Sequence, residues 1–98
     1  MNPIRRHIRS SLEIIAISQE QINFFQNRRR NYKRILDDLI LLESDYDPRD
    51  PADREAYEVY CSRVHFFKVR HMFANAREKE WAKLKRKHQR LITQLSVA

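Results

Sequence analysis

The feature that most limits how this chain folds is the position of the residues that interrupt helices. The sequence contains no glycine, and two of its three prolines, Pro48 and Pro51, lie together near its midpoint. Each proline disfavours helical geometry in the residue before it, so a helix must stop there. Residues 4–47 and 52–98 contain neither glycine nor proline. The sequence therefore predicts two long helices joined by a turn.

The residues around the prolines indicate where the helices begin and end. Asp50 is a suitable N-cap for the second helix, with Pro51 at the first helical position and Asp53 at the third. We expect the first helix at about 10–45, an acidic turn at 46–50 and the second helix at 51–96. The first helix begins either near Ser10, which leaves residues 1–9 as a basic arm, or directly after Pro3.

Both segments carry apolar residues at intervals of three and four, which is the pattern of helices that wrap around each other. We expect one all-α domain over residues 1–98, folded as a long antiparallel helical hairpin resembling a coiled coil. If the chain turns at residue 48, the numbers of facing residues add up to about 96. Facing pairs then include Ile15 with Trp81, Tyr32 with Val64, Leu36 with Tyr60, Leu39 with Tyr57, Ser18 with Glu78, and Ser11 with Lys85. The two serine layers should pack loosely.

A second apolar set lies off the main stripe of each segment. If this set is exposed in the hairpin, it forms a patch of the kind that marks an interface. The simplest partner is a second copy, which would make a homodimeric four-helix bundle. The alternative is a kinked helix that packs the patch internally as a three-helix bundle. The interface residues that we predict are Ile17, Phe24, Phe66, Val69 and Phe73.

Charge is distributed very unevenly along the chain. Residues 37–58 contain nine acidic and two basic residues, a net charge of −7. The remaining residues contain eighteen basic and four acidic residues, a net charge of +14. A hairpin would therefore have an acidic turn and basic helices.

Positive charges at regular helical spacing are suited to following a phosphate backbone without reading base sequence. Double-stranded RNA is commonly bound in this way because its deep groove hides the base edges. We therefore expect a nucleic-acid-binding hairpin that prefers RNA. The predicted contact residues are Arg28, Arg30, Lys33, Arg34, Arg63, Arg70, Arg77, Lys79, Lys83, Arg86 and Arg90.

The same charges are also compatible with a scaffold or adaptor subunit of a larger assembly. Its basic helices would bind an acidic protein partner, and the aromatic patch and acidic turn would hold other chains. Charged residues on long helices also keep proteins soluble, but an excess of +14 is more than solubility requires.

Few residues have the pattern of a catalytic or metal site. Cys61 and His65 are four residues apart and share a helix face, yet no orienting acid or glycine-built oxyanion turn accompanies them. The histidines lack metal-ligand spacing. We therefore expect no enzyme, no cofactor, no metal and no small-molecule substrate.

The sequence also bears on the compartment. The single cysteine excludes an internal disulfide and fits a reducing compartment, and no apolar run is long enough to span a membrane. We expect a cytoplasmic or nuclear protein that is not bound to a membrane. The basic, serine-containing start of the chain also resembles a mitochondrial presequence in composition.

Overall fold

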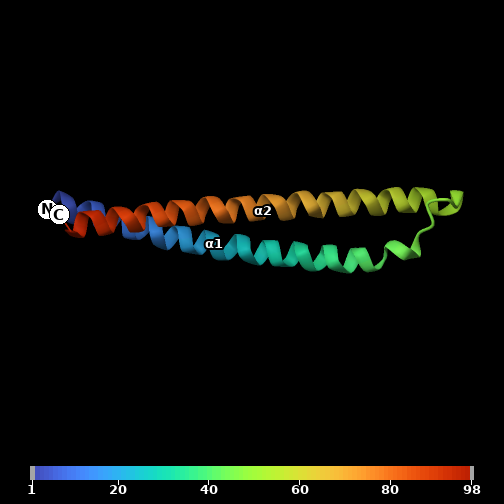
Figure 1. Cartoon of the computed structure of the whole chain (residues 1–98), viewed down its shortest axis with the longest axis horizontal. Helices are drawn as coiled ribbons and strands as arrows, with labels where there is room; N and C mark the ends of the chain where they lie inside the picture. The colour runs from blue at the N-terminus through green and yellow to red at the C-terminus, as the bar shows by residue number, and fades with distance from the viewer. Residues whose placement is uncertain (1, 98) are drawn as a thin grey trace. The chain divides into compact units, whose positions relative to one another are not determined.

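The computed structural model describes residues 2–97, which form two long helices and one short helical turn. Helix α1 spans Pro3–Leu41, the 3₁₀ turn η1 spans Glu43–Asp45, and helix α2 spans Pro51–Val97 (Figure 1). The described residues contain no strand. The predicted all-α helical hairpin is confirmed, whereas its assembly into a four-helix bundle stays a prediction.

The chain divides into two compact units, each built from both helices. The connection unit is Asn27–Ala74, in which residues 42–50 join α1 to α2. The end unit combines Met1–Gln26 with Asn75–Ala98. In the end unit, the start of α1 and the end of α2 lie side by side (Figure 1).

Helix α1 starts at Pro3, so the basic residues before Ser10 are helical instead of forming an arm. Asn2 explains this start, because its side-chain Oδ1 accepts a hydrogen bond from the Ile4 backbone N at 3.0 Å. An asparagine cap followed by proline at the first position is a favourable helix N-terminus. The helix ends at Leu41, before the predicted boundary near residue 45.

The start of α2 is held by three aspartates of the connection. Asp50 caps the helix, since its Oδ1 accepts a hydrogen bond from the Ala52 backbone N at 3.0 Å. Asp53 Oδ2 accepts from the Asp47 backbone N at 3.1 Å, and Asp47 Oδ1 accepts from the Arg49 backbone N at 2.9 Å. The bond to Asp50 satisfies a backbone donor that the helix N-terminus leaves without a partner, and the other two bonds fix the connection that precedes the helix.

Burial in the connection unit follows a single seam along each helix. Every third or fourth residue is at least half-buried, and the residues between them are exposed, apart from Asp53. This is the packing pattern of a two-helix coiled coil. The seam residues are Arg29, Tyr32, Leu36 and Leu39 of α1 with Tyr57, Tyr60, Val64, Phe67, His71 and Ala74 of α2.

The facing pairs are offset by three residues from the predicted ones. The ring centroids of Tyr32 and Phe67 are 6.2 Å apart, and the Tyr60 hydroxyl donates to the Leu39 carbonyl oxygen at 2.6 Å. The predicted pairing of Tyr32 with Val64 and of Leu36 with Tyr60 is therefore wrong. The numbers of facing residues add up to about 99.

The connection accounts for this offset. Because α1 stops at Leu41, the following residues run alongside the first turns of α2. The Tyr46 ring packs there, with its centroid 5.1 Å from that of Tyr60 and 6.3 Å from that of Tyr57. Tyr57 consequently packs against the connection, and Tyr60 becomes the residue level with Leu39.

The two serine layers of the end unit are well buried, contrary to the expected loose packing. Ser11 is 6% exposed and Ser18 is 0% exposed. Ser11 Oγ lies 3.0 Å from His88 Nδ1, within hydrogen-bonding distance. The same register places Ser18 level with Trp81, and a small residue opposite a large one allows close packing.

The buried hydroxyl of Ser18 makes no hydrogen bond to any other residue among 2–97. We expect Ser18→Ala to raise the free energy of unfolding by about 1 kcal/mol, because a buried polar group without a partner costs stability. Thermal and chemical denaturation would measure this change. The matched control is Ser11→Ala, which removes the bond to His88 and should lower stability by about 1 kcal/mol. If both variants lower the free energy of unfolding, the Ser18 hydroxyl is not a buried group without a hydrogen bond.

Candidate nucleic-acid interface

All eleven basic residues predicted to bind nucleic acid are exposed. They are divided between the two units, so each unit has its own basic surface. The connection unit contains Arg28, Arg30, Lys33, Arg34, Arg63 and Arg70, and the end unit contains Arg77, Lys79, Lys83, Arg86 and Arg90.

Two of the arginines converge on one tyrosine in the connection unit. Arg28 Nη1 donates a hydrogen bond to the Tyr32 hydroxyl oxygen at 3.3 Å. Hydrogen bonds from Arg28 and from Arg70, on the opposite helix, lower the pKa of Tyr32 below its ordinary value of 10.0. The Arg70 guanidinium also lies over the Phe66 ring, 4.4 Å from its centroid. Arg70 therefore joins the two helices through Tyr32, and Arg28 supports the same hydroxyl from within α1.

The tyrosine side chains should ionise in a defined order. Tyr32 is expected to ionise first, below pH 10.0, because the two arginines favour its phenolate. Its ionised form stabilises the fold increasingly as the pH rises through its folded pKa toward 10.0. Tyr57 and Tyr60 should ionise above 10.0, because a hydrogen bond with Cys61 raises the pKa of Tyr57 and burial raises that of Tyr60. The stability that their neutral forms provide is lost as the pH rises above 10.0 through those folded pKa values.

Ultraviolet absorbance of the phenolate during an alkaline titration would show this order. The Tyr32→Phe variant should lack the first step and retain the later ones. If the first step persists in that variant, Tyr32 is not the group with the lowered pKa.

The other basic side chains differ in whether they have acidic neighbours. Arg77 Nη1 lies 2.9 Å from Glu80 Oε2 in an exposed ion pair. Arg63 lines a hollow on α2 together with Glu55 and Glu58. Among the described residues, the seven predicted contacts that then remain on the outer helix faces make no ion pair. They are Arg30, Lys33, Arg34, Lys79, Lys83, Arg86 and Arg90.

The structure adds Lys87 to the basic surface of the end unit. Lys83, Lys87 and Arg90 line one hollow of about 470 Å³, together with Leu84 and Glu80. The spacing of these three residues, by four and then three positions, puts them on one helix face. That spacing is visible in the sequence, but Lys87 was not among the predicted contacts.

The five predicted interface residues are also exposed. Ile17 and Phe24 belong to the end unit and are 50% and 47% exposed. In the connection unit, Phe66, Val69 and Phe73 line a hollow of about 630 Å³ with Ser62, His65 and Arg70. An adjoining hollow of about 490 Å³ is lined by Glu55, Glu58, Val59, Ser62, Arg63 and Phe66. The two hollows share Ser62 and Phe66, so we describe them together as the α2 groove.

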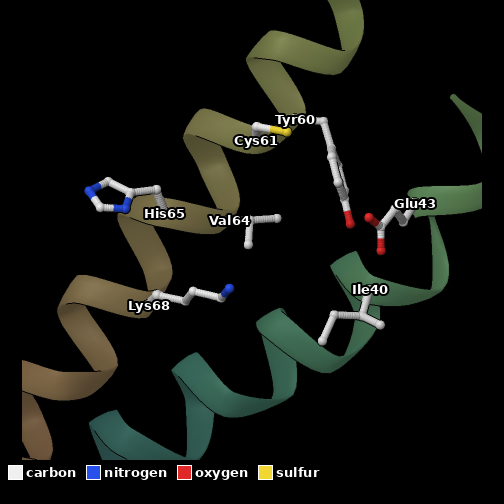
Figure 2. A pocket seen from close by; sticks show the side chains of 7 residues that line it. All are labelled: Ile40, Glu43, Tyr60, Cys61, Val64, His65 and Lys68. Carbon is white, nitrogen blue, oxygen red and sulfur yellow. The ribbon is translucent and has the colours of Figure 1, made fainter. Parts of the chain in front are cut away.

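Another hollow of the connection unit, of about 470 Å³, contains the only cysteine (Figure 2). Its lining includes Ile40 and Glu43 on one side and residues of α2 on the other. Figure 2 shows the Cys61 thiol directed toward Tyr60, whereas the His65 ring points away from the thiol. This arrangement does not form a thiol–imidazole pair.

No known protein family, curated protein or solved structure matches this chain. Within residues 2–97, no cluster of three or more histidine, cysteine or acidic side chains is arranged to hold a metal ion. Neither helix, over the same residues, has a segment that is long and apolar enough to cross a membrane. The functional argument therefore depends on the basic surfaces and the α2 groove.

Proposed function

We propose that this protein binds nucleic acid through its phosphates, with duplex RNA as the preferred ligand. The observation that carries the proposal is the set of seven exposed basic side chains without an acidic partner among the described residues. Residues outside 37–58 have an excess charge of +14. Such an excess attracts polyanions and releases their counterions on binding.

The helical scaffold explains why the ligand would be recognised by shape and charge. Side chains on a helix have fixed spacing, and these chains end in ammonium or guanidinium groups that bind phosphate well. Duplex RNA hides its base edges in a deep groove and is read mainly through its backbone. Cytoplasm and nucleus are the compartments in which we expect this ligand.

Not all eleven predicted contacts fit this role equally. Arg28 and Arg70 are engaged with Tyr32, and Arg77 is paired with Glu80. We therefore assign phosphate binding to the seven other basic residues on the outer helix faces, with Arg63 and Lys87 beside the set. If about six phosphates are neutralised, the logarithm of affinity should fall with the logarithm of salt concentration with a slope near −5.

The test is a binding titration over a series of salt concentrations. Labelled duplex RNA, duplex DNA and single-stranded RNA would be compared, with heparin as the competing polyanion. Binding that prefers duplex RNA, resists heparin and follows the steep salt slope would support the proposal. Equal binding to every polyanion, or no binding at moderate salt, would reject the proposal that the protein recognises duplex RNA. The basic residues would then be only a charged surface.

The α2 groove favours a second candidate function, that of a scaffold subunit in a larger assembly. Phe66, Val69 and Phe73 are about half exposed and lie together. If the protein is a scaffold subunit, Phe73→Asp should abolish its assembly with the partner. Charge reversal of the arginines on the outer helix faces should then have little effect on assembly. If the protein instead binds RNA, the charge reversals should weaken RNA binding and Phe73→Asp should have little effect on it. An RNA-binding assay on these variants therefore separates the two candidates.

A further inference from the structure

Helix α2 has a second apolar seam, which α1 does not cover. Its members are spaced alternately by three and four residues, as in a coiled coil. Each of Val59, Phe66 and Phe73 directly precedes a residue of the seam that faces α1. One residue corresponds to a rotation of about 100° on an α-helix. Ser62 and Val69 lie two residues, or about 200°, from the nearest residues of that seam, so the second seam is centred on the side of α2 away from α1. The second seam consists of Val59, Ser62, Phe66, Val69 and Phe73.

The exposed area of the chain is large for its mass. A compact monomer of 12.0 kDa exposes about 6,000 Å². This chain exposes 7861 Å², and few of its apolar side chains are fully buried. The excess of about 1,900 Å² is within the area that each chain of an obligate homodimer buries. A partner on the α2 groove would remove part of this excess.

We propose that a second copy of this chain occupies the α2 groove, with its own α2 running in the opposite direction. In this alignment Phe66 packs against Val69 of the partner copy. Ser62 packs against Phe73 of the partner copy, so that a small side chain faces a large one in each layer. The two layers repeat symmetrically about a two-fold axis, as in an isologous dimer.

The charge distribution of the chain selects this partner and this direction. Glu55 and Glu58 line one end of the groove, within the segment 37–58 that has a net charge of −7. Beyond the other end, α2 continues into a basic stretch that includes Lys79 and Lys83. An antiparallel copy brings the acidic segment of each chain toward the basic stretch of the other, which favours association. A parallel copy would bring the two acidic segments together.

This inference does not depend on nucleic-acid binding, and the first test is the oligomeric state of the purified full chain. Sedimentation and light scattering should give twice the 12.0 kDa mass of one chain. Phe66→Asp should raise the dimer dissociation constant at least about 30-fold, because it puts a charge at the centre of an apolar interface. Leu12→Asp is the matched control, since Leu12 is 54% exposed and lies outside the groove. A monomeric wild type, or a dimer unaffected by Phe66→Asp, overturns the proposal.

A second test does not require a variant with a charged interface. In a Cys61→Ser background, chains carrying Ser62→Cys would be mixed with differently tagged chains carrying Phe73→Cys and then oxidised. The antiparallel arrangement predicts disulfides between the two kinds of chain. Cross-linking only between two Ser62→Cys chains would show a parallel dimer and overturn the assigned direction. If the groove holds a different protein, neither cross-link forms and the proposal is overturned.

Discussion

Replacing Arg30 and Arg34 together by glutamate is expected to weaken binding to duplex RNA at least about tenfold and to reduce the salt slope by about two. Both side chains are exposed and make no ion pair among the described residues. Arg34 lies two residues from both Tyr32 and Leu36, about 200° around the helix from the seam, so the substitution should not disturb packing. Fluorescence anisotropy with labelled duplexes would measure affinity and slope.

The matched control reverses Arg49 and Arg54, which are exposed in the acidic segment. It changes the net charge by the same amount but alters no predicted contact, so its effect on affinity should be much smaller. Equal losses in the two variants would show that only total charge matters. A loss for one RNA sequence and not for others would contradict recognition of the backbone.

Ile22→Ala is expected to have the largest effect on stability, lowering the free energy of unfolding by about 2–4 kcal/mol. Ile22 is a buried apolar residue of the end unit, 8% exposed, and lies seven residues before Arg29, so it continues the spacing of the α1 seam. Truncation removes apolar burial and leaves a cavity that two rigid helices close only partly. Denaturant unfolding at one fixed protein concentration would measure the change, because association also contributes to apparent stability.

Ile40→Ala provides the comparison. Ile40 is on the same helix but is 55% exposed, so the same truncation should cost less than about 1 kcal/mol. Similar losses at both positions would mean that the seam does not form the core.

The sequence was sufficient to predict the architecture because the relevant signals are local. The prolines and Asp50 act on their immediate neighbours, and the apolar periodicity marks the seam directly. The start of α1 was ambiguous because both Ser10 and the pair Asn2–Pro3 are acceptable N-termini. The structure selects the latter.

The facing pairs were harder to predict because they depend on the path of residues 42–50. The prediction paired residues symmetrically about residue 48. It did not include the early end of α1 or the packing of Tyr46 against Tyr57 and Tyr60. An error of three residues then changed the expected neighbours of Ser11 and Ser18. Both are buried because their actual neighbours differ from the predicted Lys85 and Glu78.

Exposure of the candidate site was predictable, but the interactions of its side chains were not. Helical spacing alone puts the basic residues outside the seam. Recognising that Arg28 and Arg70 converge on Tyr32 requires the correct register between the helices. The sequence identified the apolar interface residues of α2, and the structure adds that Ser62 connects them to Val59 in one groove.

The hydrogen-bonded connection between the helices also determines the order in which the chain can fold. Its hydrogen bonds join residues close in sequence, so they form with little loss of loop entropy. Once it is closed, the Tyr60–Leu39 bond spans only 21 positions, whereas Ser11 and His88 are 77 apart. Each pair along the seam brings the next within reach. We therefore expect the two helices to pair progressively from the connection outward, so that the two chain ends pair last.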